Sequence, residues 1–180
     1  MKNYIFGIST FMLILGLNGC SDNTDLVKDG VMNFNKTITV GEAFDNWNDC
    51  ESSEWKSFKT DNNTPVVEFT CEVKDIKEFL NKAKSFLPKK EQSNASYLDI
   101  ESVTKIFQWT INKDDTFQIN NVQSKMVLVD GTKSLTSLKP MKEFRIVYNN
   151  KKNPFSLGNI NKQVAIPIAY SIKILKIQAK

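Results

Sequence analysis

The first twenty residues of the chain place the strongest constraint on how the rest of it folds. Lys2 supplies a positive charge, and the stretch from Tyr4 to Leu17 is mostly apolar, with breaks at Gly7 and Gly16. This stretch is shorter than the ~20 residues that a membrane-spanning helix needs. A basic start, a short apolar core and small residues at its end are typical of a secretory signal that is later removed. The sequence therefore predicts an exported chain that folds in an oxidising compartment.

The end of this segment, Leu17-Asn18-Gly19-Cys20, resembles the lipobox of bacterial lipoproteins, in which a small residue precedes a cysteine. The resemblance implies a signal peptide over 1–19 and a mature chain that begins at Cys20, which carries lipid. Two or three acyl chains hold a protein stably in a membrane, whereas one chain holds it reversibly. Because Ser21 follows the cysteine, the resemblance further implies an outer-membrane lipoprotein that faces the periplasm. The alternative is an ordinary cleavable signal with an incidental cysteine.

Cys50 and Cys71 remain once Cys20 is assigned to the lipid. In an exported domain an even pair of cysteines predicts a disulfide. Closing a loop of about 20 residues would stabilise the fold by about 3 kcal/mol on chain-entropy grounds. The alternative, a redox or metal-binding pair, needs a close Cys-x-x-Cys spacing or histidine partners. The spacing is wrong and the chain contains no histidine, so we expect a structural disulfide, no metal site and no cofactor.

Removal of the signal leaves about 160 of the 180 residues, enough for one domain with a hydrophobic core. The 12 phenylalanines and 3 tryptophans supply core material. Residues 20–36 contain few apolar side chains and many Asp, Asn and Lys residues. This composition predicts a flexible tether, followed by a single domain over 37–180.

Three stretches show the apolar spacing of helices. The first covers 39–48 and opens with a capping box, in which the first and fourth residues bond each other's backbone amides. Asp75 begins and caps the second helix, which Pro88 ends before a polar loop. Residues 140–148 form the third helix, with Pro140 in its first turn. A strand is the alternative for this third stretch, because its apolar residues also alternate.

Alternating apolar and polar residues predict a series of strands with polar turns between them. In the second strand the alternation places Cys71 on the buried face. Lys105 falls on the apolar face of its strand, which indicates that this strand starts later or lies at an edge. Pro167 suggests an edge position or a bulge in the final strand. The predicted strands cover 55–60, 65–73, 103–111, 116–119, 123–129, 132–136 and 164–174.

The predicted strands are joined mostly by hairpins, and Asp130-Gly131 is a strong signal for a two-residue turn. No regular alternation of strand, helix and strand appears. The sequence therefore predicts an α+β fold with a mainly antiparallel sheet, two to three helices packed on one face, and one disulfide.

Few residue patterns suggest catalysis. The lack of histidine excludes a His-dependent triad. Ser53 and Lys56 have Ser-x-x-Lys spacing, but the other elements of a β-lactamase-type site are missing. The acidic turns at 61–63 and 114–115 do not fit a calcium-binding loop, and we interpret them as solvated. Glu68 and Glu72 share a strand face, which we also interpret as solvated. We predict that the chain is not an enzyme.

The net charge is +4, and the charges are interspersed, so no block of Lys and Arg indicates nucleic-acid binding. A basic cluster surrounds the end of the second predicted helix. It is either a solvated helix face or a contact with anionic headgroups or an acidic protein. Two tryptophans belong to the core, or anchor a partner if they are exposed. The candidate partner-binding residues are Trp47, Trp55, Lys82, Lys84, Lys89 and Lys90.

These patterns favour a non-catalytic envelope lipoprotein that binds another protein, as an assembly, inhibitor, exclusion or immunity factor. Exposed aromatic residues on one face would support this hypothesis. The alternative is a carrier or sensor that holds a small apolar ligand or lipid in a pocket under the sheet. A large apolar cavity would support the alternative, and an evenly filled core would exclude it. An enzyme, the third hypothesis, would need carboxylates or a Ser-Lys pair that converge in one cleft.

Overall fold

The computed structural model describes residues 23–151 and 160–178 of the chain. The predicted signal peptide at 1–19 and the predicted lipidation site Cys20 lie outside these residues. Among the described residues, no helix has the length and apolar character needed to cross a membrane. The helices are α1 (Asn23–Asp29), α2 (Val40–Asp45), α3 (Ile76–Ser85), α4 (Lys89–Gln92), α5 (Pro140–Tyr148) and α6 (Lys162–Gln178), with a 3-10 turn η1 (Ser96–Leu98).

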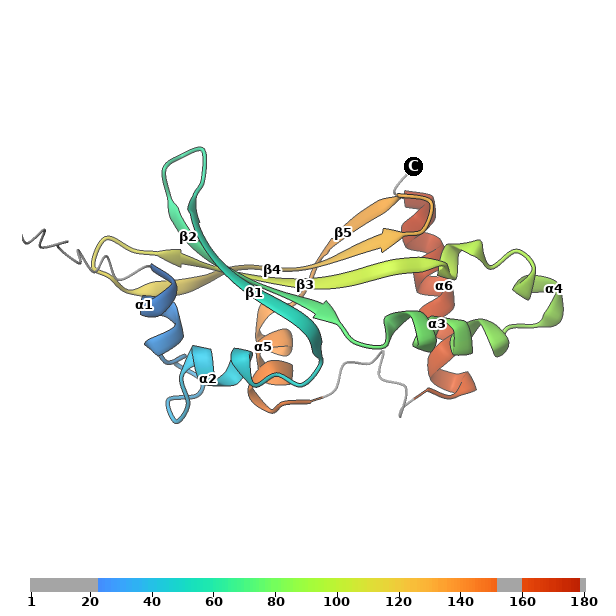
Figure 1. Ribbon diagram of the computed structural model, residues 1–180, viewed down its shortest axis with the longest axis horizontal. Helices are drawn as coiled ribbons and strands as arrows, with labels where there is room; N and C mark the ends of the chain where they lie inside the picture. Colours follow the sequence, from blue (N-terminus) through green and yellow to red (C-terminus); the bar gives the residue numbers. More distant parts are fainter. Residues whose placement is uncertain (1–22, 152–159, 179–180) are drawn as a thin grey trace, which may run out of the picture.

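Five strands form one antiparallel sheet in the order β1-β2-β3-β4-β5, so each strand pairs with the next one in the chain. Helices α1, α2 and α5 lie along one side of this sheet, and α3 and α6 pack at its far end (Figure 1). The α+β fold with an antiparallel sheet is therefore confirmed. The strands are β1 (Cys50–Lys59), β2 (Pro65–Val73), β3 (Ile100–Ile111), β4 (Phe117–Leu128) and β5 (Lys133–Ser137).

The side chains of β3 show why the sheet has one covered face. Along this central strand the odd-numbered side chains from 103 to 111 are buried, and the even-numbered ones between them are partly exposed. This alternation is the period-2 pattern of a half-buried strand. The covered face carries the core, so any internal site must lie between this face and the helices.

The core consists of two apolar clusters that share the covered face. In the larger one, Phe44 of α2 lies at the centre of a group of aromatic rings, with ring centroids 4.9 Å from Phe107 and 5.5 Å from Phe144. The second cluster joins α3 and α6 to the ends of β3 and β4. Edge-to-face ring contacts of this kind fix the position of α2 and α5 on the sheet.

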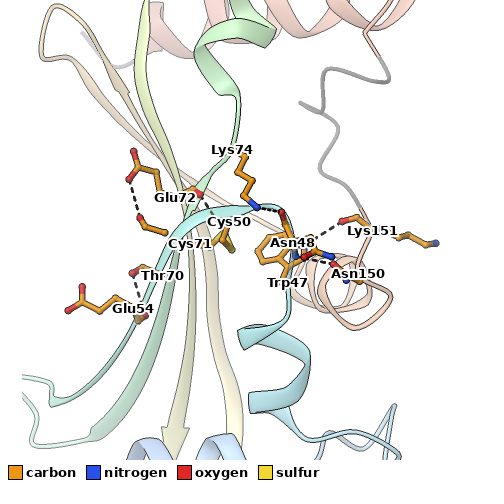
Figure 2. Close-up of a disulfide and its surroundings, with 11 residues drawn as sticks. Trp47, Asn48, Cys50, Glu54, Thr70, Cys71, Glu72, Lys74, Asn150 and Lys151 are labelled. Carbon is orange, nitrogen blue, oxygen red and sulfur yellow. Dashed lines mark hydrogen bonds between the residues drawn. A yellow bond between two sulfur atoms is a disulfide. The ribbon is translucent and has the colours of Figure 1, made fainter.

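The predicted disulfide between Cys50 and Cys71 is confirmed. The sulfur atoms lie 2.06 Å apart and the Cα atoms 5.2 Å apart. Figure 2 shows the bond joining the start of β1 to β2. Because β1 begins within five residues of the end of α2, the disulfide fastens this helix to the sheet, and Cys71 lies on the buried face as predicted.

The flexible tether predicted over 20–36 is wrong for residues 23–36, which are part of the folded domain. Helix α1 buries Val27, and the loop after it buries Met32. Lys28 also forms an ion pair with Asp45 of α2 at 2.7 Å. Most of the apolar residues of this polar segment are spaced so that they contact the core.

The strand predicted over 164–174 is wrong, because these residues belong to the helix α6. Ala165, Ala169 and Ile172 follow helical spacing and are the buried residues of α6, so the helix packs through a narrow face of mainly small side chains. The Asn161 side chain caps the helix by accepting hydrogen bonds from the amides of residues 163 and 164. Pro167 lies inside the helix on its exposed side, where it removes one backbone hydrogen bond of the helix.

Five smaller expectations can be compared with the structure. The capping box at Thr39 and the helix at 140–148 are confirmed. Asp75 precedes α3 but adopts a left-handed conformation and makes no capping bond through its side chain. The polar loop after Pro88 contains the short helix α4 and the turn η1. The strand that contains Lys105 starts earlier than expected, at Ile100, and lies at the centre of the sheet instead of at an edge.

Candidate functional site

A pocket of about 270 Å³ lies where the two apolar clusters meet, between α5 and α6 and against the covered face of β3, β4 and β5. Most of its lining is apolar. Val103 and Met126 form its floor, Ile146 of α5 lies on one side, and Ile172 and Leu175 of α6 lie on the other. Pockets that bind small molecules are typically apolar with a few polar groups, so the polar groups of this one are its informative part.

A row of polar side chains crosses the floor of the pocket. Lys105 of β3 pairs in register with Ser124 of β4, and Ser124 pairs with Thr136 of β5. All three residues line the pocket. The next row along the strands, Val103, Met126 and Ser134, is mainly apolar. The pocket is therefore amphipathic, with a polar end at Lys105 and an apolar body toward α6.

Lys105 and Glu143 form a buried ion pair at the polar end. The Lys105 Nζ atom donates a hydrogen bond to Glu143 Oε2 at 3.1 Å, and the two side chains are 9% and 8% exposed. Helix α5 places Glu143 there because Phe144 and Val147 on the same side of the helix are buried in the core. The pair removes the cost of leaving either charge alone in an apolar environment.

The ion pair retains hydrogen-bonding capacity that faces the pocket. An ammonium group has three donors and a carboxylate has about four acceptor positions. Within the described residues, the bond to Glu143 is the one hydrogen bond that the Lys105 side chain makes. Two donors of Lys105 and the second oxygen of Glu143 therefore remain for a bound molecule or for water.

Trp47 lines the pocket as well and is 4% exposed. Its indole N–H donates to the carbonyl oxygen of Lys151 at 3.4 Å, and the amide of Asn48 donates to the side chain of Asn150 (Figure 2). These bonds fasten the end of α2 to the end of α5. Trp47 is therefore a fixed part of the pocket wall and cannot act as the exposed anchor that the sequence suggested for a protein partner.

The other candidate partner-binding residues do not converge. Trp55 is partly buried, and its indole N–H donates to Asp45 at 2.7 Å. Lys84 pairs with Asp99 at 3.2 Å. The remaining three lysines are exposed and lie on α3 and α4, away from Trp55 and α2 (Figure 1): they are Lys82, Lys89 and Lys90.

The residue patterns considered for catalysis do not assemble a site in the described part of the chain. Ser53 and Lys56 lie on alternate faces of β1, and Lys56 pairs with Glu54 at 2.9 Å. Glu68 accepts a hydrogen bond from Gln108 at 2.7 Å. No group of three or more His, Cys, Asp or Glu side chains could hold a metal ion within 23–151 and 160–178.

The sequence suggested a pocket under the sheet as an alternative but did not locate its residues, although one signal for them was present. Lys105 stood out as a charge on the apolar face of a strand. Glu143 is a matching charge on the buried side of a predicted helix. Pairing the two would have located the polar end of the site, but the apolar body depends on α6, which alternation had assigned as a strand.

Comparison of the chain with protein-family models, with curated proteins and with solved structures gives no match.

Proposed function

We propose that this chain is a lipid-anchored envelope protein whose domain holds a small, mainly apolar molecule in the pocket between α5 and α6. The observation that carries the proposal is an apolar cavity of about 270 Å³ that contains a buried ion pair with spare hydrogen-bonding groups. This volume lies just below the usual range for small-molecule sites, about 300–1,000 Å³, so the ligand is small. The role is binding, and the proposal includes no catalytic step.

The anchor in this proposal is Cys20, on the lipobox-like sequence that ends there. The first described residue, Asn23, opens a helix that packs on the domain. Three residues of extended chain span at most about 11 Å. The domain would therefore sit close to the membrane surface, where apolar molecules of the envelope are concentrated.

A protein partner is the second candidate, and a different observation favours it. No described helix covers the second face of the sheet (Figure 1). This face carries two exposed apolar side chains, Phe58 on the edge strand β1 and Leu135 on the edge strand β5. The face is otherwise mainly polar, and the two residues lie on opposite edges. We rank this candidate below the pocket because the side chains do not form one apolar patch.

Two substitutions on β5 test the pocket directly. Ser134 lines the pocket, and Ser137 lies on the same strand with its side chain on the uncovered face. Ser134→Phe should fill the cavity, and Ser137→Phe is the matched control. The full chain is isolated from membranes in detergent-free lipid discs, and small molecules are extracted and identified by mass spectrometry.

We expect a molecule that co-purifies with the wild type and with Ser137→Phe and is lost from Ser134→Phe. Circular dichroism would check that both variants are folded. Identical extracts from all three proteins would contradict the pocket as a binding site. A protein that co-purifies with the wild type and is lost from Ser137→Phe would instead favour the uncovered face of the sheet.

A further inference from the structure

We infer that the molecule held in the pocket has an uncharged head group that both accepts and donates a hydrogen bond, such as an alcohol or a primary amide. This inference rests on the proposed function and names the chemical class of the ligand. It follows from the position, the charge and the bonding capacity of the groups at the polar end.

The position of the polar groups sets the orientation of a bound molecule. The polar row formed by Lys105, Ser124 and Thr136 lies beside the row that contains Val103 and Met126. A molecule with a polar head therefore fits in one orientation, with its head at Lys105 and its apolar body toward α6. The reverse orientation would bury a polar head against Ile172 and Leu175 of α6 without partners, which is unfavourable.

The charges at the polar end favour a neutral head group. The charges of Lys105 and Glu143 cancel, and both side chains are more than nine-tenths buried. An anionic or cationic head group would add a third, unpaired charge at a buried site, where desolvation is expensive. Lys142 also lines the pocket, but it is exposed, so solvent screens its charge and it compensates little for a buried anion. A neutral head group leaves the existing balance intact.

The spare donors and acceptors of the ion pair favour a head group that does both. An alcohol oxygen can accept a hydrogen bond from Lys105 while its O–H donates to Glu143, without breaking the bond between the two residues. A primary amide offers the same combination. A carboxylate can accept from Lys105 but cannot donate, and it would stand beside the like charge of Glu143. The spare groups of the ion pair therefore match a head that is donor and acceptor at once.

The volume of the pocket sets the length of the probe molecules used to test this inference. At about 30 Å³ per water molecule, a cavity of 270 Å³ holds roughly nine water-sized units. A chain of seven carbons with a terminal bromine and a hydroxyl group has a comparable number of heavy atoms. Bromine quenches tryptophan fluorescence on contact, and Trp47 lines the pocket.

The experiment compares 7-bromoheptan-1-ol, 7-bromoheptanamide and 7-bromoheptanoate at pH 7.5. Quenching is measured on the full chain in lipid discs, with free probe determined by dialysis. Trp47→Phe removes the reporter, and Ser134→Phe blocks the cavity, so both variants correct for probe in the lipid. We expect the alcohol and the amide to bind at least about tenfold more tightly than the carboxylate, because the carboxylate brings an unpaired charge.

The outcomes separate the inference from the proposed function. If 7-bromoheptanoate quenches Trp47 at equal or lower concentration than the alcohol, the inference of a neutral head group is wrong. The pocket would then still bind a ligand, as the proposed function requires. If none of the three probes quenches more than in Trp47→Phe, the proposed function itself is wrong. A preference for the neutral probes supports the inference.

A double variant tests whether the ion pair is the group that recognises the head, because any apolar pocket disfavours an anion. Replacing both Lys105 and Glu143 by Met keeps the site uncharged and similar in volume, a change that buried ion pairs often tolerate. We expect the ratio of the dissociation constants of 7-bromoheptan-1-ol and 1-bromoheptane to rise about tenfold in the double variant, since the hydroxyl group loses its partners. An unchanged ratio in a folded double variant would overturn the placement of the head at Lys105.

Discussion

Lys105 on the central strand and Glu143 on α5 are 38 residues apart in the chain, and their charged groups lie 3.1 Å apart inside the domain. Each charge is stable at its buried position because the other is present. Removing one partner leaves an isolated charge in an apolar environment, whereas removing both leaves none. The pair therefore links the stability of the fold to the polar end of the pocket.

Single substitutions of this pair should be much more harmful than the double one. We expect Lys105→Met or Glu143→Met alone to lower the free energy of unfolding by about 3–5 kcal/mol, and the double variant to lower it far less. Urea denaturation measures all three. Lys56→Met is the control, because the Lys56–Glu54 pair is exposed and an exposed ion pair contributes little to stability. If each single variant loses as little stability as Lys56→Met, the charges of Lys105 and Glu143 stay hydrated in the folded protein.

The sequence predicted most of the sheet because its strands carry a local signal. Alternation located β2, β3 and β5 within a few residues. The chain turns at Asp130-Gly131 as expected, with Gly131 at a positive φ of 82°, but four residues instead of two separate β4 from β5. The capping box at Thr39 fixed the start of α2 for the same reason. Each of these features depends on residues close together in the chain.

The errors have a common cause, which is that burial depends on distant partners. In α6 the isoleucines alternate as in a strand, but packing against α3 selects the face with Ala165 and Ala169. Lys105 appeared incompatible with a central strand because Glu143, its partner, comes from another element. The pocket requires both α6 and this pair, so the candidate site was less predictable than the sheet.

The Cys50–Cys71 disulfide gives a second stability prediction. The two residues are separated by 21 positions, and closing a loop of this length stabilises a fold by about 3 kcal/mol on chain-entropy grounds. Cys50→Ala and Cys71→Ala should therefore lower the free energy of unfolding by similar amounts. The double variant should be no less stable than either single variant, because the bond is lost once. Additive losses in urea denaturation would show that the two cysteines act separately.

The proposed lipid anchor predicts a change in location. Cys20→Ser removes the thiol that would carry the lipid, so the protein should move from the membrane fraction to the soluble fraction. Immunoblotting of separated fractions measures this. Cys50→Ser is the matched control, because Cys50 lies in the disulfide and this variant keeps Cys20. Membrane retention of Cys20→Ser would contradict the anchor.

We expect the ionisation of Tyr148 to make the free energy of unfolding depend on pH in the alkaline range. It lies at the end of α5 beside the Phe34 ring, with centroids 4.9 Å apart, and burial raises the pKa of its hydroxyl group to about 12 from an ordinary value of 10.0. The unfolded chain thus releases this proton at lower pH than the folded one. The stabilisation that this difference in pKa gives the folded state is complete below pH 10 and is lost as the pH rises through about 12. In Tyr148→Phe the free energy of unfolding should fall less steeply over this interval than in the wild type. Urea denaturation at several pH values measures the slopes, and equal slopes would show that Tyr148 ionises at an ordinary pKa.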